Sequence, residues 1–270
     1  MKAFATEVDE HVATLWLANP DRRNAMGPEF WDELPAAVTA LADDERVRAV
    51  VLAAKGPHFS VGLDLVRMAA QLGPVLSGGQ AKERLGLFDL IHRMRAGFDR
   101  IAESRKPFIA AVHGACIGGG LDLVAACDVR VASRDARFSL REAKIAIVAD
   151  MGSLQRLRGV VPEGWLRELA LTGRDVDAAT AERIGLANRV VEGSADEVVA
   201  EARALAREIA ANSPLAVAGT KEILNHGARY GADASLRYVA AWNAAHLASA
   251  DLMEAVSAFA AKRAPAFKGE

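Results

Sequence analysis

The sequence predicts an α/β fold in residues 1–194, followed by a helical segment in residues 195–270. Two observations lead to this prediction. In the first part, short runs rich in β-branched residues alternate with longer runs whose apolar residues recur at helical spacing. After residue 195 the strand-like runs stop and only helical patterns remain. A chain of 270 residues, 51% of them hydrophobic, is long enough to bury a sizeable core.

Five short apolar segments of the first part have the composition typical of strands. They are residues 12–17, 47–52, 108–112, 128–132 and 190–191. The segment 108–112 follows Pro107 and contains no polar residue, which predicts a buried strand.

Helical patterns lie between these strands and occupy the C-terminal part. The expected helices are 28–41, 81–104, 120–126, 153–159, 163–171, 195–211, 214–227 and 233–261. We expect the last one to break near residues 249–251. Pro214 suits a helix start, because the first helical position needs no hydrogen-bonded N–H. Residues 70–80 contain several glycines and Pro74, which predict a flexible loop.

The charge and the cysteines exclude several classes of protein. A net charge of -2 gives no attraction to nucleic acid or to membrane surfaces, so neither is an expected partner. Cys116 and Cys127 are too few for a disulfide framework, and the six histidines show no metal-binding spacing. No run of 18 apolar residues occurs, and the N-terminus lacks the apolar region of a signal peptide. We therefore expect a cytoplasmic protein without a metal.

The stretch His113–Asp122, with the sequence HGACIGGGLD, is the most informative feature of the chain. Its glycines allow backbone geometry and close approach that a Cβ would prevent. The helix expected after them offers free N–H groups and a positive dipole end, which suit an oxygen that becomes negative during a reaction. Two further acids, Glu142 and Asp150, follow in the sequence. This combination indicates proton transfer next to a carbonyl group.

Four motifs resemble those of the crotonase (enoyl-CoA hydratase/isomerase) superfamily, in the same order. They are Arg22–Met26, Phe59–Leu65, His113–Asp122 and Gln155–Leu157. The resemblance spans nearly the whole chain. It implies a spiral of ββα units (residues 1–194) and a helical segment (195–270) that assembles homotrimers, often paired into hexamers. It also implies an acyl-CoA thioester as substrate, with coenzyme A as part of that substrate and no other cofactor.

The resemblance also implies roles for individual residues. The backbone N–H groups of Leu63 and Gly119 would form the oxyanion hole. The residues implied in binding the substrate and its coenzyme A are Arg23, Ala25, Ser60, Val61, Gly62, Asp64 and Leu65. Arg22, Lys262 and Lys268 are further candidates for contacts with the phosphates.

Within the superfamily, three features are similar to the Δ3,5-Δ2,4-dienoyl-CoA isomerases. The run from His113 to Arg130 looks like that of this subfamily, Asp122 replaces the glutamate usual in hydratases, and Asp150 replaces a usual glycine. Such an isomerase moves a proton from C2 to C6 of the acyl chain. We expect Glu142 to be the base at C2 and Asp150 the acid at C6, with Asp122 orienting Glu142.

The spacing of these acids adds two expectations. In a regular helix over residues 142–150, Glu142 and Asp150 would lie on nearly the same face, two turns apart. Three acids beside one apolar cavity should also titrate as a coupled set, with at least one raised pKa.

Two other functions remain open. An enoyl-CoA hydratase would hold a water molecule between the carboxyl groups at positions 122 and 142, and the shorter Asp122 would displace that water. A non-catalytic homologue that binds acyl-CoA or RNA is the alternative from another class. The near-neutral charge argues against RNA, and the retention of three acids argues against a protein without catalysis.

Overall fold

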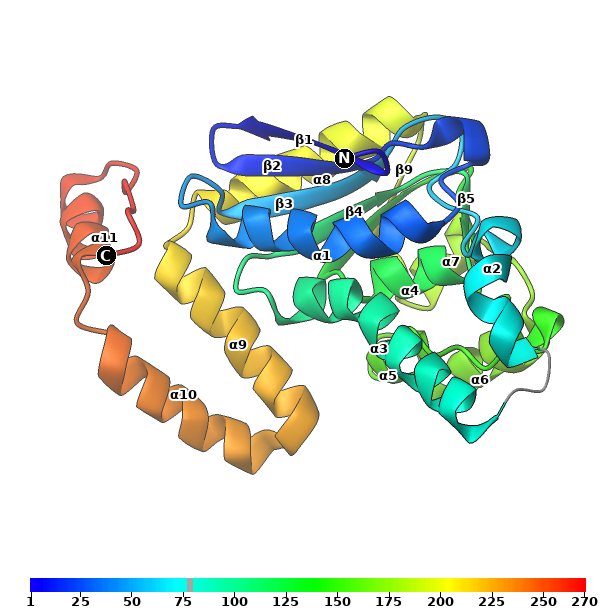
Figure 1. Ribbon diagram of the computed structural model, residues 1–270. Helices are drawn as coiled ribbons and strands as arrows, with labels where there is room; N and C mark the ends of the chain where they lie inside the picture. The colour runs from blue at the N-terminus through cyan, green and yellow to red at the C-terminus, as the bar shows by residue number, and fades with distance from the viewer. Residues whose placement is uncertain (77–79) are drawn as a thin grey trace.

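The computed structural model describes residues 1–76 and 80–270. Within these residues the main sheet has six strands in the order β1-β2-β3-β4-β6-β9 (Figure 1). They are β1 (Phe4–Asp9), β2 (Val12–Leu17), β3 (Ala49–Ala54), β4 (Phe108–Val112), β6 (Val129–Ser133) and β9 (Arg189–Val191). β1 pairs with β2 in antiparallel orientation, and the other neighbouring strands are parallel.

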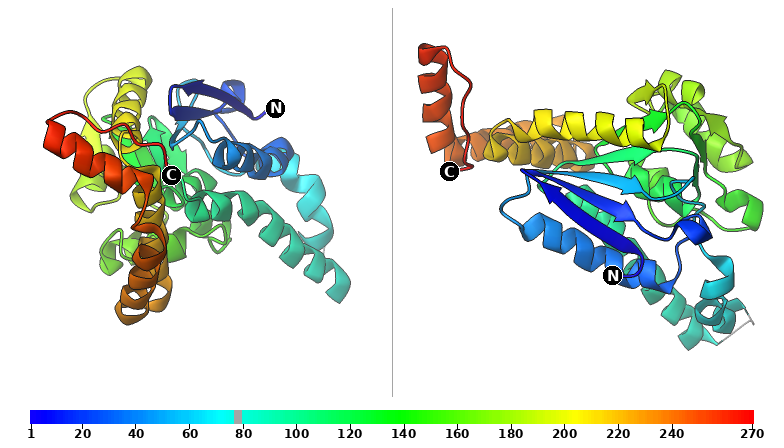
Figure 2. Two further views of the ribbon diagram at one scale, coloured as in Figure 1. Left: turned by 90° about the vertical axis from the view of Figure 1, so that its left-hand side faces the viewer. Right: turned by 90° about the horizontal axis from the view of Figure 1, so that it is seen from above.

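Both faces of the main sheet are covered, which is why its inner strands are apolar on both sides. In β3, Val50 and Leu52 point into one hydrophobic layer, whereas Val51 and Ala53 point into the other. The first layer is shared with helices α1 (Pro28–Asp43), α3 (Ala81–Glu103) and α4 (Gly119–Ala125). The second layer is shared with α8 (Ala195–Ala210), which crosses the opposite face (Figure 2).

A smaller sheet of order β5-β7-β8 continues from the main one, because only His113 and Gly114 separate β5 from β4. Its strands are β5 (Ala115–Ile117), β7 (Arg137–Ser139) and β8 (Val176–Asp177). The remaining elements before α8 are η1 (Pro20–Arg22), α2 (Leu65–Leu76), η2 (Glu142–Ile145), α5 (Ser153–Arg156), α6 (Glu163–Thr172) and α7 (Ala178–Arg183).

The three last helices extend away from the sheet (Figure 1). They are α9 (Pro214–Tyr230), α10 (Ala232–His246) and α11 (Ala250–Ala261). α9 is attached to the core by the buried Lys221, whose Nζ donates to Asp128 Oδ2 at 2.8 Å and to the carbonyl of Ile101 at 3.2 Å. In the described part of the chain, no helix is long and apolar enough to cross a membrane.

The structure confirms the strands expected at 12–17 and 108–112 and the break of the last helix near residues 249–251. The prediction of a loop over 70–80 is wrong up to Leu76, where α2 ends, and its residues 77–79 lie outside the described residues. Asp64 starts α2, because its Oδ1 accepts the N–H of Arg67 at 3.1 Å. Strand β1 was not expected, since it is an exposed, charged edge strand.

Candidate active site

Two loops that follow neighbouring parallel strands lie side by side at the centre of the candidate site. One follows β3 and the other follows β4, and the two exchange main-chain hydrogen bonds. Ser60 N donates to Ala115 O at 2.9 Å, and Ile117 N donates to Ser60 O at 3.0 Å. Because the carboxyl ends of parallel strands meet at one edge of a sheet, this is where a ligand site is expected.

Glycines allow this close approach. A Cβ at Gly62 would lie 2.7 Å from the carbonyl oxygen of Ile117, and Gly62 has a φ of +84°, which favours glycine. A Cβ at Gly120 would lie 2.9 Å from the carbonyl oxygen of Ser60. Gly118, with a φ of +53°, turns the chain into α4. Larger residues at these positions would separate the two loops.

The amides of Leu63 and Gly119 lie on these two loops. Met26 N donates to Gly62 O at 2.8 Å and Asp64 N donates to Met26 O at 3.1 Å, so the intervening N–H of Leu63 points away from Met26. The N–H of Gly119 is at the start of α4, 3.2 Å from a Cβ built on Gly62. Among the described residues, neither amide donates to a protein acceptor. Both are therefore free to bind an oxygen of a ligand.

Asp122 lies in the first turn of α4 and is buried. Its Oδ1 accepts the N–H of Ser153 at 2.8 Å, which joins α4 to the start of α5. Burial raises the pKa of this carboxyl, although the hydrogen bond from the Ser153 N–H acts in the opposite direction. The side chain is thus held in one position while its proton affinity is increased.

Glu142 begins the short turn η2 and lies beside the glycine corner, with Oε1 3.2 Å from a Cβ built on Gly118. Its Oε2 is buried and has no hydrogen-bond partner among the described residues. Burial, followed by the negative charges of Asp122 and Asp150, raises the pKa of Glu142 to about 7. A carboxyl group with this pKa can both accept and release a proton near neutral pH.

Asp150 comes from an irregular segment. The expectation of a regular helix over residues 142–150 is wrong, because η2 ends at Ile145 and Ala146 is left-handed with a φ of +59°. The residue as a whole is exposed in the single chain. Partial burial of its carboxyl nevertheless raises the pKa, and the positive charge of Arg95 counteracts this rise. Asp150 also acts on the pKa of Asp122 and of Glu142, so the three acids form one electrostatic cluster.

The segments expected to bind coenzyme A are brought together. Val61 N donates to Arg23 O at 3.2 Å, and Ser60 Oγ donates to Asn24 O at 2.8 Å, which places the 23–25 segment beside the 60–65 loop. Arg23 is exposed and has a positive φ of 52°. Asn24, which belongs to the motif expected beside coenzyme A, is buried, and its side chain donates to the carbonyls of Lys55 and His58. Asparagine tolerates its left-handed conformation, with a φ of 53°.

Lys268 is not part of this assembly in the single chain. Its backbone N–H binds Asp251 Oδ1 at 2.8 Å, and the residue lines a pocket together with Arg48, which directly precedes β3. Lys268 therefore lies near the N-terminal end of β3, whereas the acids lie near the C-terminal ends of the parallel strands. The sequence motifs contain Arg156 without assigning it a role, and they do not contain Arg95 or Asp99, because charged residues on a helix give no local signal of such a role. Arg95 acts on the charge of Asp150, Arg156 acts on that of Asp122, and Asp99 bonds to both arginines. Within the described ranges, no group of three or more potential metal ligands is formed.

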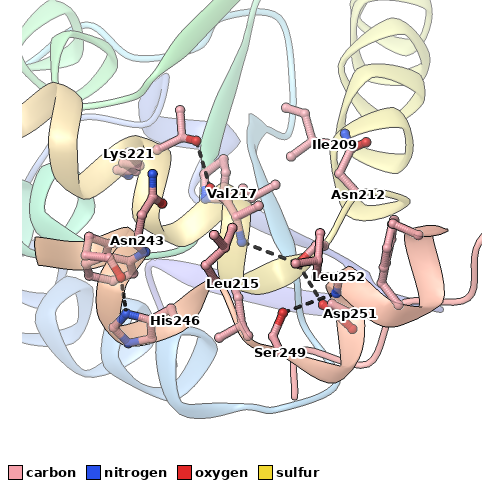
Figure 3. A pocket seen from close by; sticks show the side chains of 18 of the residues that line it. Ile209, Asn212, Leu215, Val217, Lys221, Asn243, His246, Ser249, Asp251 and Leu252 are labelled. Atoms are coloured by element: carbon pink, nitrogen blue, oxygen red, sulfur yellow. Dashed lines mark hydrogen bonds between the residues drawn. The ribbon is translucent and has the colours of Figure 1, made fainter. Parts of the chain in front are cut away.

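A separate cavity of about 740 Å³ lies among the C-terminal helices (Figure 3). Leu215 and Val217 of α9, Trp242 of α10 and Leu252 of α11 contribute to its apolar lining. None of the three acids lines it. This cavity is therefore distinct from the candidate active site.

Comparison with known proteins identifies the family of this chain. Residues 7–270 match the family described as Enoyl-CoA hydratase/isomerase. The mitochondrial Delta(3,5)-Delta(2,4)-dienoyl-CoA isomerase of Dictyostelium discoideum is 44% identical over 95% of this chain and 87% of its own length. The peroxisomal enzyme of the same name from Arabidopsis thaliana is 42% identical over 99% of this chain and 96% of its own.

The structure of an enoyl-CoA hydratase from Bacillus anthracis has a TM-score of 0.89 at 28% identity, and the comparison covers 99% of this chain and 100% of that one. The predicted α/β spiral fold is thereby confirmed. Sequence and fold together show that this chain is an enzyme of the crotonase, or enoyl-CoA hydratase/isomerase, family, with a sequence similar to dienoyl-CoA isomerases.

Proposed function

We propose that this enzyme converts 3,5-dienoyl-CoA to 2,4-dienoyl-CoA by moving a proton from C2 to C6 of the acyl chain. The observation that supports this most directly is the third acid, Asp150, whose negative charge helps to raise the pKa of Glu142 and of Asp122. A shift over five atoms requires a base and an acid at different distances from the thioester. The similarity to proteins named dienoyl-CoA isomerases supports the same substrate.

In the proposed reaction, Glu142 removes a proton from C2, and the electrons of the broken C–H bond spread over the conjugated chain and the thioester oxygen. The amides of Leu63 and Gly119 bind this oxygen as it becomes negative. One such donor is worth about 3–4 kcal/mol of transition-state stabilisation. Asp150 then gives a proton to C6, and the double bonds move from positions 3 and 5 to positions 2 and 4.

The charges of the site support this division of work. The pKa of about 7 allows Glu142 to act as a base at neutral pH and to hold the proton afterwards. Asp122 contributes negative charge from a buried position, which keeps that pKa high. Three neighbouring carboxyl groups cannot all be ionised at low energetic cost, so the cluster retains a proton that can be delivered to the substrate.

We propose that coenzyme A is bound along the segment 60–65 and the segment 23–25, with Arg22 and Arg23 near its phosphates. Both arginines are exposed and follow β2 at the same edge of the sheet as the acids. The prediction that no further cofactor is needed stays part of this proposal, because every step uses groups of the chain and of the substrate.

Hydration of a 2-enoyl-CoA is the second candidate function. The direct influence of Asp122 on Glu142 favours it, because a hydratase needs two neighbouring carboxyl groups around one water molecule. Asp122, however, is engaged with Ser153, and Asp150 has no role in that reaction. We therefore rank isomerisation first.

A spectroscopic experiment separates the alternatives. The purified enzyme is mixed with a 3,5-dienoyl-CoA, and formation of the conjugated 2,4-dienoyl thioester is followed by its ultraviolet absorption. We expect rapid formation of this product and much slower hydration of crotonyl-CoA. The reverse order of rates would identify a hydratase, and tight acyl-CoA binding without turnover of either compound would indicate a binding protein.

We also propose that helices α9 to α11 assemble the chain into a trimer or a pair of trimers. Large apolar side chains are exposed on these helices in the single chain. They include Leu224, Leu236, Leu252, Met253, Val256 and Phe259. Together with the apolar cavity beside them (Figure 3), they provide a surface that gains from burial. Light scattering after gel filtration should give three or six times the monomer mass of 28.6 kDa.

The cytoplasmic location stays a prediction. The dienoyl-CoA isomerases named above are described as mitochondrial and peroxisomal, so the location of a relative does not transfer to this chain. Microscopy of a tagged full chain in its own cell would test it.

A further inference from the structure

An aspartate on α3 joins two arginines next to the catalytic cluster. Arg95 and Asp99 lie one helical turn apart, and Arg95 Nε donates to Asp99 Oδ2 at 3.0 Å. The other oxygen of Asp99 accepts a hydrogen bond from Arg156 Nη2 of α5. Asp99 thus links α3 to α5. Asp99 and Arg156 are 57 residues apart in the sequence. The proposed reaction uses none of these three side chains directly.

Arg156 holds the turn that follows Asp150. Its Nη1 donates to the carbonyl oxygen of Met151 at 2.8 Å. Its guanidinium covers Gly152, where any Cβ would overlap it and where the φ of +113° favours glycine. The next residue, Ser153, gives its N–H to Asp122. One side of this turn is therefore tied to Arg156, and the other side is tied to Asp122.

The surroundings of Asp150 contain charges of both signs. The negative groups are Glu142 of η2 and Asp122 of α4, and the positive group that acts on Asp150 is Arg95 of α3. The positive charge of Arg156 likewise lowers the pKa of Asp122. Asp99 is occupied by the two guanidinium groups. Arg95, held on α3 by its hydrogen bond to Asp99, lies close enough to act on the charge of Asp150.

We propose that Arg95, Asp99 and Arg156 form a clamp that positions the Asp150 turn against Asp122 and places a fixed positive charge opposite the Asp150 carboxylate. The proposal rests on the function proposed above. The three are positioning residues, because they act through the acids and do not touch the reacting atoms. Their chemical contribution follows from the reaction itself. When Asp150 has given its proton to C6, it becomes a carboxylate, and Arg95 stabilises that negative charge.

Removal of the charge at position 95 should change the titration of Asp150. Without the facing cation, the carboxylate form is less favourable, so the pKa of Asp150 should rise in Arg95→Gln. Arg95→Lys keeps a cation and should retain most of the original titration. Arg93→Gln removes a charge from an exposed position of the same helix and is the matched control, which should leave the titration unchanged.

The measurement is a 13C NMR titration of the aspartate carboxyl groups in the full chain without substrate. The signal of Asp150 is identified by its absence in Asp150→Asn. A higher pKa of Asp150 in Arg95→Gln, but not in Arg93→Gln, supports the clamp. Equal pKa values of Asp150 in the wild type, Arg95→Gln and Arg93→Gln overturn it. This readout does not depend on the reaction. If the wild-type enzyme hydrates crotonyl-CoA and does not isomerise dienes, the proposed function fails while the clamp is still tested.

Kinetics and structure test the positioning role. Arg156→Lys keeps the charge but cannot bind Met151 and Asp99 with one planar group. We expect kcat to fall about tenfold to a hundredfold with little change in KM, because the acid is displaced while coenzyme A binding is intact. The NMR signal of the Ser153 amide should also shift in Arg156→Lys. A general loss of stability, without movement of this turn, would not shift it. Unchanged kcat and an unchanged Ser153 signal in Arg156→Lys would contradict the clamp.

The pH profile links the two experiments. In Arg95→Gln, the part of the kcat profile that reports Asp150 should move to higher pH, and Arg95→Lys should restore it. A uniform loss of activity at all pH values would show that Arg95 serves only the stability of α3 and would overturn its electrostatic role.

Discussion

Two acids near the opposite ends of α4 are used in different ways. Asp122, in the first turn, accepts a main-chain N–H from Ser153, and among the described residues no cation lies within ion-pair distance of it. Asp128, just beyond the other end, is paired with Lys221 Nζ at 2.8 Å and accepts the N–H of Phe108 at 2.7 Å. One short helix thus carries an acid of the candidate site and leads into an acid that anchors α9.

The physical difference is the presence of a bonded cation. The ion pair between Lys221 and Asp128 attaches α9 to the core. Burial without such a cation raises the proton affinity, so the region of Asp122 and Glu142 can exchange protons. Mutations in one region should therefore leave the property of the other region unchanged.

The largest expected effect concerns the chemical region. Asp150→Asn keeps the shape of the side chain but removes the proton that C6 requires. Isomerisation should slow by about 10²- to 10⁴-fold, while acyl-CoA binding measured by calorimetry stays close to that of the wild type. Asp89→Asn on the exposed side of α3 is a suitable control. Normal turnover by Asp150→Asn would exclude this residue from the reaction.

In the architectural region, Lys221→Met should lower the free energy of unfolding by up to about 3 kcal/mol, because the carbonyl oxygens of Ile101 and Lys106 lose a buried donor and the partly exposed Asp128 loses its cation. Denaturation in urea measures this loss. Turnover per folded molecule should be unchanged. Lys221 belongs to α9 and bonds to Ile101 and Asp128, not to the acids of the candidate site. The double variant Lys221→Met/Asp128→Asn should recover part of the loss. If it is no more stable than the single variant, the unpaired charge is not the cause.

The glycines between the two loops should be nearly as sensitive as the acids. In Gly62→Ala, the new Cβ meets the carbonyl oxygen of Ile117, so the loops must separate. We expect the oxyanion hole to lose alignment and kcat to fall about 10²- to 10³-fold. Gly164→Ala, where a Cβ has open space, is the control. Equal activity of Gly62→Ala and Gly164→Ala would argue against an oxyanion hole formed by the amides of Leu63 and Gly119.

A smaller effect is expected in the dependence of stability on pH. The pKa of Glu142 is raised from 4.5 to about 7 by burial and by Asp122. Between these values the native state binds more protons than the unfolded state, so the free energy of unfolding decreases as pH rises through that window. The contribution of Glu142 is up to about 3 kcal/mol. Urea unfolding at pH 5 and pH 8 should therefore show a larger decrease for the wild type than for Glu142→Gln, whereas equal decreases would contradict the raised pKa.

Much of the architecture could be predicted from local patterns. Apolar, β-branched runs identify β2 and β4, because a strand buried on both faces must be apolar throughout. The patterns failed where a distant partner decides the conformation. Helix α2 packs on the core through Met68 and runs through Gly73 and Pro74, and β1 pairs with β2 in spite of its charged composition. Such elements depend on neighbours that the local sequence does not contain.

The sequence by itself determined the kinds of group that the enzyme can use: the glycine corner, the identities of Asp122, Glu142 and Asp150, and the family to which they point. Only the tertiary structure decided the state of these groups. The burial of Glu142 and the bridge from Asp99 to Arg156 join residues far apart in the chain. The physical reason is that proton affinity depends on desolvation and on nearby charges, and both are set by three-dimensional packing.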